Sequence, residues 1–114
     1  MKTRRVSFDR HEGRRDRRYP LPPLVITIDG AEYKTVNWSL GGFLIDGFAG
    51  KTTPGRLLTG TLGPAERPAI IEFTATVVRI GEPAPDQLAV RFNDLGERDI
   101  SILERIITRR LFRA

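Results

Sequence analysis

Hydrophobic and polar residues alternate over much of the chain between residues 24 and 92, and a period of two is typical of half-buried β-strands. Glycine-containing turn signals such as Asp29-Gly30 and Gly63-Pro64 interrupt the alternation. The pattern predicts six strands, at Leu24–Ile28, Ala31–Ser39, Phe43–Ile45, Arg56–Leu62, Ala69–Ile80 and Gln87–Phe92. Short strands with a turn roughly every ten residues are typical of a small antiparallel β-barrel or rolled sheet.

The strand expected at residues 31–39 has one face that is more polar than the other. Strict alternation places Asn37 and Ser39 on one face, and Val36 and Trp38 on the opposite face. The polar face continues through Tyr33 and Thr35. We expect Trp38 in the core, because a large aromatic side chain gains much from burial. An amide and a hydroxyl are then left side by side on the outward face.

The apolar period changes to three and four residues after Asp94, which predicts an amphipathic helix. Its apolar stripe consists of Ile100, Leu103, Ile107 and Leu111, widened by Ile102 and Ile106. Asp94, followed three residues later by Glu97, is expected to cap the N-terminus of the helix. We expect the helix to pack across one end of the barrel; a helix lying on a membrane surface is the alternative. The expected fold class is therefore mainly all-β, a small antiparallel β-barrel of about six strands with a C-terminal α-helix packed against it.

The composition argues against several classes of site. The 114 residues correspond to one domain by length. The chain has no cysteine and a single histidine, His11, so we expect no disulfide, metal site or catalytic triad. No apolar run approaches the roughly 20 residues of a membrane span, and the N-terminus lacks the apolar region of a secretory signal. We expect a cytoplasmic binding protein that is not an enzyme, needs no cofactor and does not insert into a membrane.

The net charge of +5 is confined to the N-terminus. Residues 1–18 contain eight Lys and Arg residues against three acidic residues, whereas residues 19–114 contain eleven of each sign. We therefore predict two parts, a basic and flexible N-terminal arm at residues 1–18 and a barrel with its helix at residues 19–114. The partner of the arm should carry negative charge.

Two short motifs carry the candidate binding chemistry. In the arm, Arg14 and Arg18 are four residues apart, and each guanidinium can bind a phosphate or the O6/N7 edge of guanine through two donors. At and just after the end of the expected second strand, Asn37, Ser39 and Gly42 form the pattern Asn-x-Ser-x-x-Gly. A glycine has no Cβ and allows a ligand to approach the backbone closely, although a glycine bulge at the end of a polar strand is the alternative.

The ordered pair of motifs resembles the PilZ domain family, which is identified by RxxxR followed by (D/N)xSxxG in a barrel of this size. The resemblance covers residues 10–112 and implies binding of the bacterial second messenger cyclic di-GMP without catalysis. It implies that Arg14 and Arg18 grip guanine and phosphate, while Asn37, Ser39 and Gly42 line the barrel side of the pocket. Two further candidates are Arg15, which lies inside the first motif, and Arg10, which extends its four-residue spacing.

The resemblance also implies a mechanism and an output. The ligand would order the arginine arm over the barrel face, and a downstream partner protein would read the changed surface. Members of the family control motility, exopolysaccharide synthesis and virulence. The motifs predict neither the identity of the partner, nor the oligomeric state, nor the number of ligand molecules bound.

Two other functions are compatible with the same residues. One is a small barrel that binds single-stranded nucleic acid without sequence preference, although the candidates for base stacking are few. These candidates are Tyr19, Tyr33 and Phe112. The other is a PilZ-like adaptor that acts only through contacts with proteins.

Overall fold

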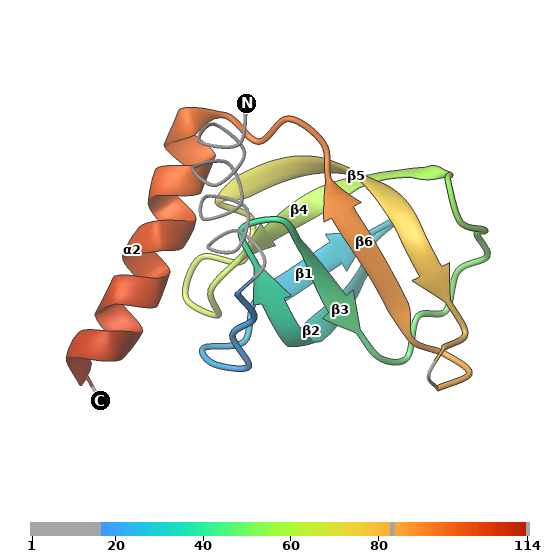
Figure 1. Ribbon diagram of the computed structural model, residues 1–114, viewed down its shortest axis with the longest axis horizontal. Coiled ribbons are helices and arrows are strands. Elements are labelled where there is room, and N and C mark those ends of the chain that lie inside the picture. Colours follow the sequence, from blue (N-terminus) through green and yellow to red (C-terminus); the bar gives the residue numbers. More distant parts are fainter. Residues whose placement is uncertain (1–16, 83, 114) are drawn as a thin grey trace, which may run out of the picture.

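Six antiparallel strands form a closed barrel in the computed structural model of the protein, and one helix follows them (Figure 1). The structure describes residues 17–82 and 84–113, with side chains up to residue 109. The elements are β1 (Val25–Ile28), β2 (Ala31–Ser39), β3 (Gly42–Ile45), β4 (Leu57–Gly63), β5 (Ile71–Ile80), β6 (Leu88–Phe92) and α2 (Glu97–Arg113). The predicted fold class is confirmed, and the predicted strand ends differ from the observed ones by no more than two residues.

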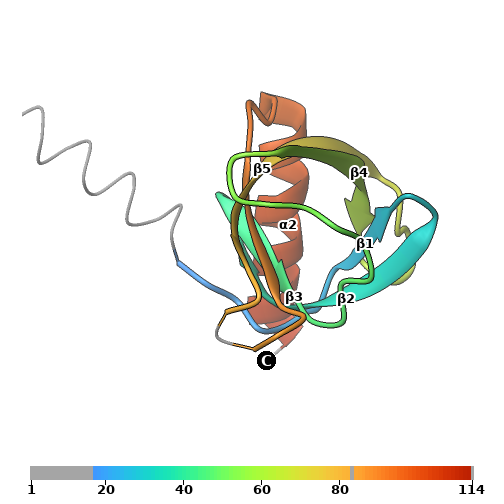
Figure 2. The ribbon, with the colours of Figure 1, turned by 90° about the vertical axis from the view of Figure 1, so that its right-hand side faces the viewer.

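The order of strands around the barrel is β1-β2-β3-β6-β5-β4, and β4 closes the barrel by pairing with β1. The hairpin between β1 and β2 turns at Asp29 and Gly30, which have φ angles of 51° and 81°. Positive φ at both central residues gives the twist that a two-residue hairpin needs. Seen from the side in Figure 2, the strands curve around a common interior and α2 lies behind them.

A β-bulge in β2 corrects the alternation that the sequence predicts for this strand. Thr35 pairs with Ile45 and Asn37 pairs with Leu44, so Val36 is the extra residue. Because of this insertion, Thr35 and Trp38 both lie inside, whereas Val36 is 38% exposed. The expectation that Val36 shares the inner face with Trp38 was wrong, and so was the grouping of Thr35 with Asn37.

A second bulge lies at Val78 in β5, between the pairs Val77–Val90 and Arg79–Ala89. Strict alternation after Val77 would place Arg79 inside the barrel. The extra residue leaves Arg79 exposed instead, so no charged side chain is buried at this position.

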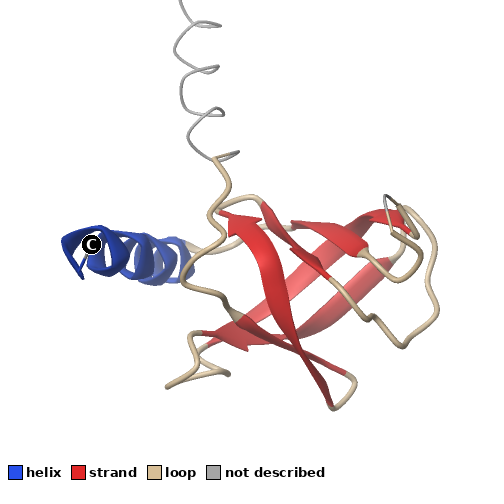
Figure 3. Ribbon diagram, turned by 90° about the horizontal axis from the view of Figure 1, so that it is seen from below, coloured by secondary structure: helices blue, strands red, loops and turns tan. Residues whose placement is uncertain are grey.

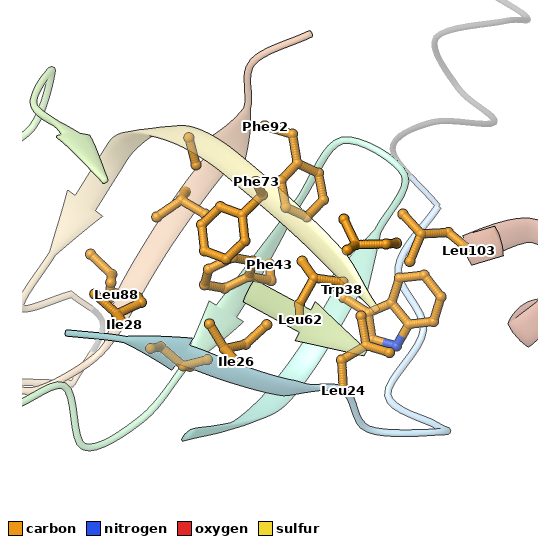
Figure 4. Close-up of a cluster of buried hydrophobic side chains, with 14 of the residues drawn as sticks. Leu24, Ile26, Ile28, Trp38, Phe43, Leu62, Phe73, Leu88, Phe92 and Leu103 are labelled. Carbon is orange, nitrogen blue, oxygen red and sulfur yellow. The ribbon is translucent and has the colours of Figure 1, made fainter. Parts of the chain in front are cut away.

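The core of the barrel is built around three phenylalanines from three different strands. Phe43, Phe73 and Phe92 have ring centroids 5.4 to 5.9 Å apart, within the range of favourable aromatic pairs (Figure 4). Trp38 is completely buried, as the sequence predicts, and lies at one end of this core.

Helix α2 lies beside the end of the barrel that contains Trp38 (Figures 1 and 3). Leu103 is 0% and Ile106 3% exposed, so the centre of the predicted apolar stripe packs into the core. The expected end of the stripe at Leu111 lies outside the described side chains. The packing confirms that the helix completes the core.

The expectation that Asp94 caps the helix was wrong. The helix begins at Glu97, and the first helical bond joins the Ile100 amide to the carbonyl of Gly96. Asp94 has a φ of 52° and lies in the connection that turns the chain from β6 toward the helix. Among the described residues, there is no helix that is both long enough and apolar enough to cross a membrane.

Candidate ligand-binding site

The segment that precedes β1 is bound to β2 as a short extra length of sheet. Tyr19 and Trp38 form an antiparallel bridge in which the Tyr19 amide donates to the Trp38 carbonyl at 2.7 Å and the Trp38 amide donates back at 3.0 Å. The two rings contact each other, with centroids 5.6 Å apart. This bridge determines which residues of the segment can reach β2.

Three further hydrogen bonds hold the segment between Tyr19 and β1. The Trp38 indole Nε1 donates to the Pro22 carbonyl at 2.8 Å. The Leu24 amide donates to the hydroxyl of Thr35 at 2.9 Å, and the Thr35 amide donates to the Leu24 carbonyl at 3.0 Å. The prolines of this segment cannot donate backbone hydrogen bonds, and the chain bends at Leu21 and Pro22 before it reaches β1.

Arg18 lies against the outward face of β2 because it precedes the bridged Tyr19. Its Nε donates to Oδ1 of Asn37 at 2.8 Å, and its Nη1 donates to Oγ of Ser39 at 3.2 Å. Asn37 and Ser39 flank the inward-pointing Trp38, so both project from the opposite face of the strand. The structure therefore brings together one arginine of the first motif and two residues of the second, which are 19 and 21 positions away in sequence.

The hydroxyl of Ser39 is fixed from two sides. Besides the bond from Arg18, its Oγ accepts a bond from the Gly41 amide at 3.0 Å. Ser39 is 1% exposed, so the outward face is covered at this position. Both lone pairs of the hydroxyl are used, which leaves the serine little freedom to change rotamer.

The structure gives a packing reason for glycine at position 42. A Cβ added to Gly42 would lie 2.0 Å from the carbonyl oxygen of Val90 and 3.1 Å from Cα of Arg91. Strand β6 therefore occupies the space that a side chain would need. At Gly42, the group that comes close to the backbone is therefore strand β6 of the barrel itself.

Three of the predicted arginines, Arg10, Arg14 and Arg15, lie outside the described residues. The sequence also missed a residue of the site, because Tyr19 was considered only as a stacking aromatic. Its bridge to Trp38 positions Arg18. The signal was its place between the arginine cluster and the prolines, where an extended chain can pair with a strand.

The arrangement presents a guanidinium whose plane is oriented by an amide and a hydroxyl at the surface of a rigid barrel. Such a group binds planar or tetrahedral anions and the acceptor edge of guanine. Within residues 17–82 and 84–109 there is no cluster of His, Cys, Asp and Glu that could hold a metal ion. The geometry thus favours recognition of an anionic ligand.

Comparison with models of protein families finds no match for the chain, and comparison with curated proteins finds none either. Among solved structures, the chain is similar to the inhibitor of motility MotI/DgrA from Bacillus subtilis. The TM-score is 0.59 and the identity 21%, over 81% of this chain and 47% of that chain. The similarity supports the fold, and this chain spans about half the length of the motility inhibitor.

Proposed function

We propose that the chain is a receptor domain for cyclic di-GMP of the PilZ type, which binds the dinucleotide without transforming it. The observation that carries the proposal is the pair of hydrogen bonds from Arg18 to Asn37 and Ser39. The two motifs of the PilZ pattern are separated in sequence, yet one residue of the first contacts two residues of the second. A basic tail that only improves solubility would not need such a defined contact.

In this proposal Arg18 is the residue that meets the ligand, and Asn37 and Ser39 hold its side chain in the binding orientation. An arginine has many rotamers, and fixing its guanidinium before binding reduces the entropy lost when the ligand arrives. Gly42 contributes by letting β6 pack beside β3, which keeps the turn after Ser39 in place. Arg14 is proposed as the second gripping residue, with Arg15 and Arg10 as further candidates.

Ligand binding would order the arm over the barrel. Cyclic di-GMP carries two negatively charged phosphates, so it can neutralise the repulsion among closely spaced arginines. The expected consequence is that residues 10–17 resist trypsin only when the ligand is present. Unchanged cleavage at saturating cyclic di-GMP would exclude this ordering step.

The output is proposed to be control of a partner protein. The fold is similar to that of a protein whose name is inhibitor of motility, and this similarity supports motility as one process to test. The partner would recognise the surface formed by the ordered arm and the bound nucleotide.

Two observations favour this proposal over non-specific binding of single-stranded nucleic acid. Tyr19 contacts Trp38 and Tyr33 contacts Phe48, so both described tyrosines have their rings engaged in the protein. Among the described residues, the large hydrophobic side chains that are well exposed are aliphatic. Base stacking by these residues is therefore disfavoured.

The proposal is tested by titrating labelled cyclic di-GMP into the protein and its Arg18→Ala and Arg17→Ala variants. Loss of a bidentate guanidinium contact is worth about 1–3 kcal/mol, so Arg18→Ala should weaken binding roughly 5- to 150-fold. Arg17→Ala is the matched control, because it removes the same charge from the adjacent position. It should weaken binding much less.

Competition separates the proposed function from its rival. Unlabelled cyclic di-GMP should displace the label, whereas GTP and short single-stranded DNA should not at comparable concentrations. Equal affinity of the wild-type protein and Arg18→Ala would refute the assignment of Arg18. Efficient competition by DNA would favour the nucleic-acid function instead.

A further inference from the structure

A groove of about 450 Å³ lies between α2 and the connection from β4 to β5, away from the arginine site. Its described lining includes neither the segment 17–24 nor β2. One wall is residues 64–70, where the Arg67 amide donates to the Pro64 carbonyl at 2.9 Å. A Cβ at Gly63 would lie 2.0 Å from the carbonyl oxygen of Arg67, so this wall packs closely on the end of β4. The groove is therefore part of the folded barrel and helix.

The floor of the groove is apolar. It is formed by Pro64 and Ile70 from the connection and by Ile102 and Ile106 from the helix. Ile106 is 3% exposed and belongs to the core, whereas Ile70 and Ile102 are only partly buried and pack against it. The helix thus has more apolar surface than the barrel covers, and the excess faces this groove.

The rim of the groove carries three arginines and one acidic residue. Arg67 comes from the connection, and Arg105 and Arg109 come from the helix, where they are one turn apart on the same side. All three are exposed, and Glu66 is the acidic member. Like charges at this helical spacing repel each other, and a third arginine on the facing wall adds to the effect.

No carboxylate of the described part of the chain forms an ion pair with a rim arginine, although Glu66 lies in the same lining. The ion pair found between described side chains joins Arg98 and Asp99, at the start of the helix and outside the groove lining. The three rim arginines thus have no Asp or Glu within 4.0 Å there. The rim, with three arginines against one glutamate around an apolar floor, has a net positive charge, and such a surface is complementary to an acidic partner with an apolar side chain.

We propose that this groove is the docking surface for a partner protein, and that it takes an acidic segment carrying one aliphatic or aromatic anchor residue. The anchor would occupy the floor beside Ile70 and Ile102, and carboxylates on either side would pair with Arg67, Arg105 and Arg109. Buried anchors with arginines around them are the typical arrangement of residues that dominate binding energy in protein interfaces.

Other occupants fit the groove less well. An anionic bilayer requires apolar side chains that protrude, whereas here the apolar residues form a concave floor. Single-stranded nucleic acid requires aromatic platforms, and the described lining contains no aromatic residue. The protein's own residues 1–16 contain six basic and three acidic residues, so they carry the same sign of charge as the rim.

The proposal does not depend on nucleotide binding at Arg18, and one set of variants tests it separately. The probe is a fluorescein-labelled peptide of about twelve residues, with glutamates flanking a central leucine. Fluorescence anisotropy measures its binding to the whole 114-residue chain. Two companion peptides replace the glutamates by glutamine or the leucine by serine, and both should bind roughly tenfold more weakly.

Reversing charges at the rim should weaken the interaction. The Arg105→Glu/Arg109→Glu variant should bind the acidic peptide roughly tenfold or more weakly, and Arg67→Glu on the opposite wall should act in the same direction. Arg98→Glu is the control, because it reverses one charge, as Arg67→Glu does, and lies on the same helix as Arg105 and Arg109 but outside the groove. Its affinity should stay within about twofold of the wild-type value.

Three results would overturn the proposal. The first is no saturable binding of the acidic peptide at low ionic strength. The second is equal binding by the rim variants or by the peptide without its leucine. The third is stronger binding to phosphatidylglycerol vesicles than to the peptide, which would assign the groove to a membrane. The Arg18→Ala variant should bind the peptide normally, and the rim variants should bind cyclic di-GMP normally, so this proposal and the nucleotide site can fail independently.

Discussion

Replacing Gly42 by alanine separates a structural from a ligand-binding role for the last residue of the Asn-x-Ser-x-x-Gly motif. The added Cβ would lie 2.0 Å from the Val90 carbonyl oxygen, whereas carbon and oxygen normally approach to about 3.3 Å. Strands β3 and β6 must therefore move apart by roughly 1 Å at this position. The three nearest atoms all belong to the backbone of β6, so no side chain can rotate to relieve the clash.

The magnitude follows from two contributions. Overpacking a tight interior costs about 1–3 kcal/mol. Separating the strands also weakens the nearby bond from the Phe92 amide to the Gly41 carbonyl, which measures 2.8 Å and contributes about 0.5–1.5 kcal/mol. We expect Gly42→Ala to lower the free energy of unfolding by about 2–4 kcal/mol, a large part of the total for a domain of this size.

The assay is urea unfolding followed by the fluorescence of Trp38, which is the single tryptophan of the chain and is fully buried. Gly96→Ala is the control, since a Cβ there meets nothing within 4 Å, and its effect should be about 1 kcal/mol or less. An unchanged unfolding midpoint for Gly42→Ala, together with weaker binding of cyclic di-GMP, would refute the packing role. The glycine would then be needed for the ligand.

Two other substitutions test the positioning of the site and the role of the helix. Thr35→Val removes the acceptor of the buried Leu24 amide, and we expect it to lower the free energy of unfolding by about 1–3 kcal/mol. The control Thr59→Val, at an exposed position, should lower it by less than about 0.5 kcal/mol. Equal effects in denaturant titrations would contradict the importance of that hydrogen bond. Leu103→Ala should cost about 2–5 kcal/mol by opening a cavity between helix and barrel, whereas Leu57→Ala, at a side chain that is 64% exposed, should cost far less. A small effect of Leu103→Ala on the thermal unfolding midpoint would show that the helix is not part of the core.

Much of the fold is predictable from the chain because its local signals agree with one another. Asp29 and Gly30 form the expected hairpin turn, and the change of apolar period after residue 94 marks the only helix among residues 17–82 and 84–113. The bulge in β5 had a sequence signal, an arginine at an inward position. The bulge in β2 had none, because Val36 and Trp38 are both apolar and either could have been placed inside.

The start of the helix was mispredicted because Asp94 fits a capping pattern but has another structural role. Asp94 and Glu97 match the spacing of a capping box, yet the chain uses Asp94 in a left-handed conformation to leave the sheet. Local sequence preferences cannot decide whether Asp94 caps the helix or turns the chain, since this depends on where the helix packs against the barrel. The buried Leu103 and Ile106 determine that position.

The contact between the two motifs was expected only through the resemblance to a family. From the residues alone, nothing relates Arg18 to Asn37 and Ser39, because their approach depends on the register of the Tyr19–Trp38 bridge. A single bridged pair between a proline-rich segment and a strand leaves no periodic signal in the sequence. The sequence thus identified Arg18, Asn37 and Ser39 as candidates, and only the structure shows that their side chains are in contact.

A double-mutant cycle on cyclic di-GMP affinity tests most directly whether the two motifs form one site. Isothermal titration would compare the wild-type protein, Arg18→Ala, Asn37→Ala and the double variant. If Asn37 acts by holding Arg18, then Asn37→Ala should weaken binding in the wild-type background and have almost no effect once Arg18 is alanine. We predict a coupling energy of about 0.5–3 kcal/mol, in the range found for residues in direct contact. Fully additive effects, or unchanged affinity in all four proteins, would contradict a ligand site built on this contact.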